Sequence, residues 1–480
     1  MEILEAREQR KANVLAFGEP GCTTLCLKAN LPTGWKQGWQ ANLVLKAVRL
    51  EIERWQPQKT AFYRSADGDY YLFALKESAE ACKRKCMQLE ETHPLGRLAD
   101  LDVYREGQSV SRTEFGGTLR KCMLCDLPAA VCVRNRTHAA EEVMRFAEKK
   151  LRDYYQPLIE RAVSNAVQGE LHLPHKFGLV EPNSDGAHRD MNLASMERSA
   201  KAVLPFWMQM FWQGVKAPFP QAFEACRTLG LLAEEAMYAA SGGVNTYKGL
   251  IFQLGCLLYS FGHLTGENLP WEELFQGVSL ATANSVQPKG TFGEKAKQCG
   301  FCTALEQAQR GLPAVQETWR YLQNHGRDEA SLRGALQCAL SVTDDTVLLK
   351  RAGDLSSYEA WKKRICACTP QEAPSLTKEC VRHNISIGGA ADVLVGALAV
   401  DAFAAIDRGE SLPSFRRPDW RTAAGMTKLR MLRLSEDCDD DALEYGEFDV
   451  RDFLPEKAQT FREKYKEFYD DVKLSHKEDW

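Results

Sequence analysis

The stretch HPLGRLADLDVY (residues 93–104) decides the fold of the first part of the chain. In an extended strand alternate side chains share a face, so Asp100 and Asp102 point to one side and their apolar neighbours to the other. At about 5 Å and an effective dielectric of about 20, two carboxylates repel by roughly 3 kcal/mol. A divalent cation relieves that repulsion, so the pattern predicts a metal site. A half-buried strand with a solvated acidic face is the alternative.

Length and composition set the scale of the fold. A chain of 480 residues exceeds what one core usually organises, so two domains are expected, and 44% hydrophobic residues suffice for full cores. The net charge of −4 and the pI near 6.2 give no general attraction to nucleic acid or anionic membranes. We therefore expect neither of them as a partner.

Three features indicate a cytoplasmic protein. The start, MEILEAREQRKANVL, is charged and lacks an apolar segment followed by a small-residue cleavage site. The longest apolar stretch is taken to be LIFQLGCLLYSFG (residues 250–262), which is too short to cross a bilayer. Sixteen scattered cysteines fit a reducing compartment better than a disulfide framework.

The apolar patterns divide the chain into three parts. Residues 1–152 mix strand-like runs with helical stretches, which predicts an α+β domain. Residues 153–406 carry apolar residues at three- and four-residue spacing, which predicts an all-α domain. A charged helical stretch, AAEEVMRFAEKKLRDYY (residues 139–155), is expected to connect them without a flexible linker. Residues 407–480 form a charged extension, for which a solvated or partner-binding surface is expected.

A cysteine-rich segment, RKCMLCDLPAAVCVRNRTH (residues 120–138), follows the acidic strand. The potential metal ligands in it are Cys122, Cys125, Cys132 and His138. A CxxC turn followed by a later cysteine and histidine can complete one tetrahedral Zn²⁺ site. The spacing is only moderately specific, and a packing role for the thiols or a reactive thiol are the alternatives. Arg134 and Arg136 are candidates for binding phosphate.

Three motifs of the first part occur together in one known family. They are ANLPTGWK (residues 29–36), the GRLADLDV run that ends residues 74–103, and the cysteine-rich segment. This combination resembles the holo-citrate lyase synthase family, which transfers a phosphoribosyl-dephospho-CoA group to a serine of the citrate lyase acyl carrier protein. The resemblance implies a nucleotidyltransferase-like fold in which Asp100 and Asp102 hold Mg²⁺. It also implies phosphate contacts from Arg97 and from the loop around Lys36.

Three polar clusters interrupt the helices of the second part. They are HKFGLVEPNSDGAHRDMN (residues 175–192), SGGVNTYKG (residues 241–249) and NISIGGAAD (residues 384–392). In the last two, paired glycines precede a helix start, where free amides and the helix dipole suit a phosphate. A tight turn between helices is the alternative for each pair. The candidate binding residues of these two turns are Gly242, Gly243, Asn245, Lys248, Ser386, Gly388, Gly389 and Asp392.

The same clusters resemble the triphosphoribosyl-dephospho-CoA synthase family, which joins ATP to 3′-dephospho-CoA and expels adenine. The matching segments are KFGLVxxxxxGAHRDM, GGVNTxKG with Glu234 eight residues before it, DTxxxxR and NxSxGGxAD. The resemblance implies catalytic or magnesium-binding carboxylates and cations around the triphosphate. The carboxylates are Glu234, Asp190, Asp345 and Asp392, and the cations are Lys176, His188, Arg189, Lys248 and Arg351. The sequence departs from the family at Tyr247, usually histidine, and at Val347, usually asparagine.

The two resemblances concern consecutive steps. The second part would make the triphosphoribosyl donor from ATP and 3′-dephospho-CoA, and the first would attach it to the carrier protein. We therefore predict a bifunctional, Mg²⁺-dependent transferase that matures citrate lyase. Two alternatives stay open, namely the equivalent maturation of malonate decarboxylase and a catalytically impaired, zinc-stabilised scaffold.

Overall fold

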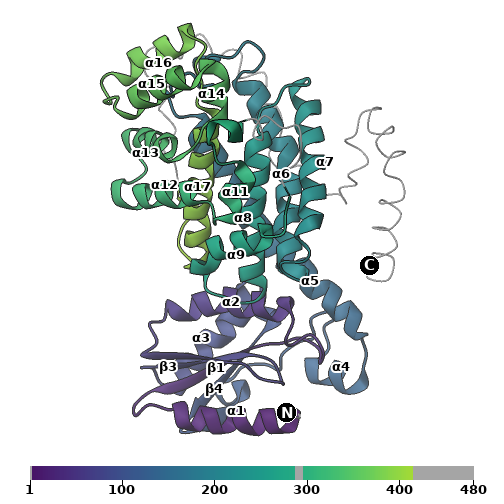
Figure 1. Cartoon of the computed structure of the whole chain (residues 1–480). Coiled ribbons are helices and arrows are strands. Elements are labelled where there is room, and N and C mark those ends of the chain that lie inside the picture. Colours follow the sequence, from purple (N-terminus) through teal and green to yellow (C-terminus); the bar gives the residue numbers. More distant parts are fainter. Residues whose placement is uncertain (1–2, 287–295, 414–480) are drawn as a thin grey trace, which may run out of the picture.

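The computed structural model describes residues 3–286 and 296–413 of the chain. A small sheet with its helices forms the N-terminal part, and a larger, helical part follows it (Figure 1). The predicted multidomain arrangement, α+β and then helical, is confirmed at this level. Most of the predicted C-terminal extension, residues 414–480, lies outside the described residues.

Five antiparallel strands form one sheet in the order β2-β3-β1-β4-β5. The strands are β1 (Thr23–Ala29), β2 (Lys59–Tyr63), β3 (Tyr70–Leu75), β4 (Ala99–Arg105) and β5 (Gln108–Val110). The register places Lys28 of β1 opposite Asp100 of β4, and Cys26 opposite Asp102. Along β4 the apolar residues are buried and the two aspartates are partly exposed, so the predicted alternation is confirmed.

Helices cover both faces of this sheet. α2 (Trp39–Glu53) and α3 (Ala79–Thr92) pack on one face, against the buried apolar side chains of β1, β3 and β4. α1 (Ile3–Phe17) packs on the other face, where Val14 and Phe17 contact residues of β1 and β3. The two aspartates of β4 point to the face covered by α1, and α1 leaves them partly exposed.

A single helix carries the chain from the sheet into the helical part. α5 (Ala140–Leu171) follows the short α4 (Ala129–Asn135) and includes the predicted charged connecting stretch. Glu141 and Glu142 in its first turn favour a helix start, because their charges oppose the helix dipole. The predicted boundary at residue 152 falls inside this continuous helix.

The helical part is built from the rest of α5 and from the helices that the polar clusters separate. They are α6 (Leu193–Lys216), α7 (Phe223–Ser241), α8 (Lys248–Gly266), α9 (Leu274–Thr282), α11 (Ala304–Gln309), α12 (Pro313–His325), α13 (Glu329–Val342), α14 (Thr346–Ala352), α15 (Leu355–Cys366), α16 (Ala373–Arg382) and α17 (Gly388–Asp407). Short 3-10 turns are η1 (Gly96–Leu98), η2 (Arg112–Phe115), η3 (Trp271–Glu273) and η4 (Lys297–Cys299). Side chains cap several helix starts, as Asn192 does for α6 and Asp328 for α13.

Helix α17 crosses the core of the helical part. Apolar residues lie all around it, interrupted by Asp392 and Asp401, which is typical of a helix surrounded by other helices. By length and composition it could span a membrane, with 20 residues and a mean hydropathy of 1.8 over an 18-residue window, but 78% of that window is buried inside the protein. The prediction that residues 250–262 are the longest apolar stretch was therefore wrong. Helix α17 can be apolar over this length because neighbouring helices bury most of it.

Helix α2 joins the two parts of the chain, because most of its residues are buried. Asn42 donates a hydrogen bond to the carbonyl oxygen of Gly266 at the end of α8, at 2.7 Å. Lys46 Nζ lies 2.5 Å from Asp407 Oδ1 at the end of α17. One hydrophobic core therefore runs from the sheet through α2 into the helical part.

Changing Asp407 to asparagine is expected to destabilise both parts together. The side chains of Lys46 and Asp407 are only 6% and 13% exposed, and removing one partner leaves an uncompensated buried charge. We expect the free energy of unfolding in urea to fall by about 3–5 kcal/mol. As a control, Glu53→Gln removes the partly exposed pair with Arg49 and should cost less than about 0.5 kcal/mol. A shift confined to one of two separate transitions would contradict the shared core.

Candidate active sites

Asp100 and Asp102, here called the acidic pair, lie side by side on β4 and both contact Lys28 of β1. Lys28 Nζ is 3.1 Å from Asp100 Oδ2 and 2.8 Å from Asp102 Oδ2. The two aspartate side chains are 38% and 31% exposed, so the acidic pair is open to a ligand. The sequence alone did not reveal Lys28, because only the pairing of β1 with β4 brings it to this face.

Lys28 and the acidic pair stabilise one another's charged forms. Burial alone would lower the pKa of Lys28, but the two aspartates outweigh burial and raise it. Burial alone would raise the pKa of Asp100, but Lys28 and Arg120 outweigh it, and the pKa is lowered. The repulsion expected between bare carboxylates is thus relieved here by an ammonium group. The exposed carboxylate oxygens also fit Mg²⁺, which takes oxygen ligands.

Arg120 is a second cation beside the acidic pair. Its Nη1 lies 3.8 Å from Asp100 Oδ1, and its Nη2 donates to the carbonyl oxygen of Arg97 at 2.9 Å. Arg97, the predicted phosphate contact, donates instead to the carbonyl oxygens of Lys121 and Cys122, at 2.5 and 2.8 Å. The geometry therefore places Arg120 beside the acidic pair, and Arg97 holds the following loop. The phosphate contact of Arg97 stays a prediction. Arg120 was not singled out from the sequence.

Lys36 belongs to a separate group of cations on the α1 side of the sheet. Lys36 Nζ is 3.4 Å from Asp67 Oδ1, and Arg7 and Arg10 approach the same carboxylate at 3.2 and 3.0 Å. Burial alone would raise the pKa of Asp67, but the hydrogen bonds from Arg7 and Arg10 outweigh it and lower the pKa to about 2. An open pocket of about 390 Å³ lies beside this group, and its lining includes Asn13, Gln37, Arg64, Ser65, Asp69 and Tyr70. A phosphate contact from Lys36 stays a prediction.

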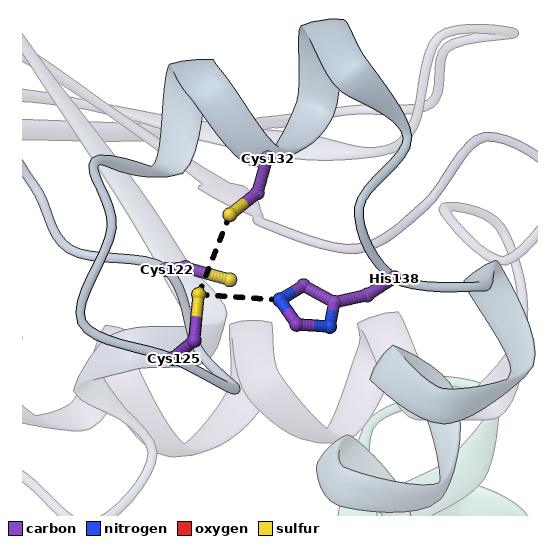
Figure 2. Close-up of side chains that lie close together, drawn as sticks. All are labelled: Cys122, Cys125, Cys132 and His138. Atoms are coloured by element: carbon purple, nitrogen blue, oxygen red, sulfur yellow. Dashed lines mark hydrogen bonds between the residues drawn. The ribbon is translucent and has the colours of Figure 1, made fainter.

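The four predicted zinc ligands converge after the acidic strand, as Figure 2 shows. The ligand atoms of Cys122, Cys125, Cys132 and His138 all lie within 4.8 Å of one another. Arg134 and Arg136 are exposed near the end of α4. Within the described residues neither arginine forms an ion pair with the acidic pair, so their binding of phosphate also stays a prediction.

The predicted residues of the second part gather where helix ends meet, at the end of α5 and the starts of α8, α14 and α17. Figure 1 shows α14 and the start of α17 at the end of the helical part away from the sheet. Lys176 is only 1% exposed, and its Nζ donates to Oε1 and to the carbonyl oxygen of Glu170, at 2.7 and 2.8 Å. Lys176 therefore holds Glu170 in place in this structure. Its predicted contact with the triphosphate stays a prediction.

Asp392, Tyr247 and Glu170 lie within electrostatic reach of one another. Burial raises the pKa of Asp392 well above its usual range, and the charges of Asp345 and Glu170 add to the effect. Burial likewise raises the pKa of Tyr247, with Glu170 and Asp392 contributing. The Tyr247 hydroxyl is buried and has no hydrogen-bond partner among the described residues. Buried hydroxyl groups are normally hydrogen-bonded. A bound substrate would give the Tyr247 hydroxyl the hydrogen-bond partner that it lacks among the described residues.

Asp345 joins the starts of two helices. Its Oδ1 accepts hydrogen bonds from two amides of α14 at 2.9 Å, and its Oδ2 accepts one from the amide of Ala390 in α17 at 2.9 Å. A Cβ at Gly389 would lie 3.0 Å from the Asp345 carboxyl carbon, and one at Gly388 would crowd Val347. The fully buried Asp345 therefore links the two helix starts, and the glycine pair permits their close approach. The binding roles predicted for Asp345, Gly388 and Gly389 stay predictions.

His188, Arg351 and Ser386, predicted from three separate motifs, are hydrogen-bonded to one another. Arg351 Nη2 is 3.0 Å from His188 Nδ1, and His188 Nε2 is 3.2 Å from Ser386 Oγ. Because a guanidinium can only donate, Nδ1 accepts and Nε2 carries the proton. Burial, and then Arg351, lower the pKa of His188 to about 4. In this structure His188 is therefore neutral at pH 7, and its predicted contact with the triphosphate stays a prediction.

Lys248 begins α8 beside the predicted Glu234. Lys248 Nζ lies 2.6 Å from Glu234 Oε2, and Asn245 Oδ1 accepts a hydrogen bond from the Lys248 amide at 3.1 Å. Gly242 and Gly243 have φ angles of 75° and 93°, which favour glycine. The Lys248 side chain is 52% exposed and paired with Glu234, and a phosphate contact from this turn stays a prediction.

Two more predicted residues lie at the rim of the second site. Arg189 and Asp190 are both exposed. The charge of Asp190 opposes the lowering of the pKa values of His188 and Arg351, which places Asp190 near both. In the sequence, Tyr247 is distinctive only because the synthase family usually has histidine at this position. The structure shows that it lies near Glu170 and Asp392.

Comparison with known families assigns both parts. Residues 1–154 match the family described as apo-citrate lyase phosphoribosyl-dephospho-CoA transferase. Residues 156–411 match the family described as ATP:dephospho-CoA triphosphoribosyl transferase. The chain therefore carries both family domains in tandem.

Individual relatives are similar to this chain over long stretches. The chain is 36% identical over 357 residues to Protein CitXG of Haemophilus influenzae, covering 67% of this chain and 77% of that protein. It is 27% identical over 449 residues to Protein CitXG of Leuconostoc mesenteroides subsp. cremoris, covering 82% and 95%. It is also 28% identical over 311 residues to the 2-(5''-triphosphoribosyl)-3'-dephosphocoenzyme-A synthase of Haemophilus ducreyi, covering 56% and 96%.

An open acidic pair in one part and a polar site between helix ends in the other define a transferase with two sites. The relatives are single chains that match across both parts. The chain belongs to the family of bifunctional CitXG fusions and acts in the biosynthesis of the citrate lyase prosthetic group. Maturation of malonate decarboxylase and a scaffold without activity are not favoured by these matches.

The pKa of His188 gives a test of the second site. We expect ¹⁵N NMR of histidine-labelled protein to show the neutral Nε2–H tautomer from pH 8 to pH 6, with protonation only near pH 4, because burial and Arg351 lower the pKa. His188→Gln assigns the signal. Arg351→Gln should move the midpoint part of the way back toward 6.5. A midpoint near 6.5 in the unaltered protein would contradict this geometry.

Proposed function

We propose that the helical part makes the triphosphoribosyl donor from ATP and 3′-dephospho-CoA, and that the sheet part passes the phosphoribosyl-dephospho-CoA group to a serine of the citrate lyase acyl carrier protein. The acidic pair on its Lys28-linked strand, in the segment that matches the transferase family, supports the second assignment most directly. We also propose that the sheet part is nucleotidyltransferase-like, and that the chain works in the bacterial cytoplasm, since its relatives are bacterial.

In the proposed transfer step, the carrier serine oxygen attacks the α-phosphorus of the donor. A P–O bond forms, the bond to pyrophosphate breaks and the serine proton is released. We propose that Asp100 and Asp102 hold Mg²⁺, which when bound would neutralise charge on the phosphates. Lys28 and Arg120 keep the acidic pair in place and add fixed positive charge beside the reacting phosphate.

In the proposed synthase step, the 2′-hydroxyl of dephospho-CoA attacks the anomeric carbon of the ATP ribose. A C–O bond forms as the C–N bond to adenine breaks, so adenine gains a proton and the hydroxyl loses one. Asp392, whose raised pKa favours the protonated carboxyl, would give the proton to adenine. Glu170, ion-paired with Lys176, would take the hydroxyl proton. Arg351 and Lys248 would bind the triphosphate.

Changing both residues of the acidic pair to asparagine is expected to abolish transfer and spare adenine release. The double variant loses both charges that would bind Mg²⁺, which should lower the transfer rate by about 10³-fold or more. Transfer is measured as the mass gain of the apo carrier protein supplied with premade donor, and adenine by chromatography. Glu91→Gln, an exposed change on α3, is the matched control. Loss of both activities in a folded variant would contradict separate sites.

Asp392→Asn should impair adenine release and spare transfer, the reverse of what is expected for the acidic pair. Without a proton donor for adenine, the rate of adenine release should fall by about 10²–10⁴-fold, while transfer from premade donor stays unchanged. Glu359→Gln, an exposed change on α15, serves as control. Unchanged adenine release in D392N would exclude Asp392 as the acid.

A further inference from the structure

Neither proposed reaction uses the cysteine cluster, which consists of Cys122, Cys125, Cys132 and His138. The cluster lies within residues 111–139, here called the cysteine lobe. We propose that the cluster binds one Zn²⁺ and that this ion holds the cysteine lobe against the acidic pair. The zinc site is independent of the proposed function, and only its effect on transfer rests on that function.

The geometry of the cluster is close to that of a tetrahedral site. Cys125 Sγ lies 3.4 Å from Cys132 Sγ and 3.3 Å from His138 Nε2. With Zn–S bonds near 2.3 Å and Zn–N bonds near 2.0 Å, a tetrahedral ion separates two sulfurs by about 3.8 Å, and sulfur from nitrogen by about 3.6 Å. Figure 2 shows the four side chains pointing toward a common centre. Small side-chain shifts would therefore complete the coordination.

The donor set selects zinc. Three thiolates and one imidazole are ligands of structural Zn²⁺, whereas Mg²⁺ takes oxygen ligands. The backbone amide of Leu124 donates to Cys122 Sγ at 3.5 Å, which favours a thiolate at that position. Cys125 and Cys132 are free thiols in this structure, with sulfurs 3.4 Å apart, whereas disulfide-bonded sulfurs lie about 2.05 Å apart.

The cysteine lobe has no hydrophobic core of its own. From residue 111 to residue 139, Cys132 is the one buried residue. Several large apolar side chains of the lobe are turned outward, with Leu119 65% and Val133 79% exposed, and Phe115 and Met123 are only partly buried, against the main core. A segment of this size without a core needs a metal or a covalent link to hold one conformation. Zinc would therefore supply the stability that apolar packing does not.

Two arginines connect the cysteine lobe to the acidic strand. Arg97, just before β4, donates to the carbonyl oxygens of Lys121 and Cys122 in the lobe. In the other direction, Arg120 of the lobe donates to the carbonyl oxygen of Ala99 at 2.6 Å and approaches Asp100. Since Cys122 would be a zinc ligand, the ion fixes the loop that positions Arg120. Loss of zinc should therefore impair transfer more than donor synthesis.

Zinc content tests the site directly. The full-length chain, purified under reducing conditions without chelator, should contain one Zn²⁺ per molecule by mass spectrometry of the metal. The C125S/C132S double variant should contain almost none. Cys22→Ser, which changes a partly buried cysteine outside the cluster, is the matched control and should keep its zinc. Loading with cobalt(II) should give the visible absorption of a tetrahedral thiolate site.

A second experiment measures the effect on transfer. A zinc-selective chelator, with excess Mg²⁺ present, should open the cysteine lobe to trypsin and lower transfer from premade donor by about 10–100-fold. Adenine release should stay within about twofold, which reports that the rest of the chain remains folded. Added Zn²⁺ should restore transfer.

The results that would contradict the zinc site, its link to the acidic pair and the proposed function differ from one another. A zinc-free chain as purified, or zinc retained by C125S/C132S, would overturn the site. Normal transfer after zinc removal would overturn its link to the acidic pair, and parallel loss of adenine release would show a general effect on folding in place of a local one. Absence of transfer in the zinc-loaded, unaltered chain would refute the proposed function and leave the zinc site standing.

Discussion

Burial of helix α2 on both of its sides fixes how the two parts of the chain fit together. One side covers the sheet, and the other contacts the helical part, where the Tyr155 hydroxyl donates to the carbonyl oxygen of Leu43 at 2.8 Å. Burying one large aliphatic side chain contributes about 1.5–3 kcal/mol, and α2 offers several to both neighbours. Each part therefore completes the core of the other, so the two parts are joined by a shared hydrophobic core as well as by the peptide chain.

Local patterns in the sequence were enough to predict the acidic strand and the helices. The alternation in β4 and the three- and four-residue spacing of the later helices are short-range signals, and both were confirmed. The order of the strands was not predictable, because pairing joins segments far apart in the chain. Lys28 is an example of a residue whose role was missed for this reason. Its charge is visible in the sequence, but its contact with Asp100 exists only because β1 pairs with β4.

In the second site, too, the sequence indicates the chemical groups, but only the structure shows their burial and their partners. The sequence identified the side chains that can carry charge, yet burial and partners decide which of them remain available. Lys176 is enclosed by the end of α5, and Asp345 is occupied by amides of two helices. Burial, together with Arg351, which lies 163 residues later in the chain, keeps His188 neutral. Such long-range contacts leave no local trace in the sequence.

The length of α17 has a consequence for the path of the intermediate. The helix starts at the synthase site and ends at α2, and 20 residues at 1.5 Å each make about 30 Å. The acidic pair lies farther still, on the face of the sheet that α2 does not cover. The proposed donor would therefore have to cover more than about 30 Å between the two sites of one chain. If the donor crosses that distance through solvent, two variant chains that each lack a different site would complement one another when mixed.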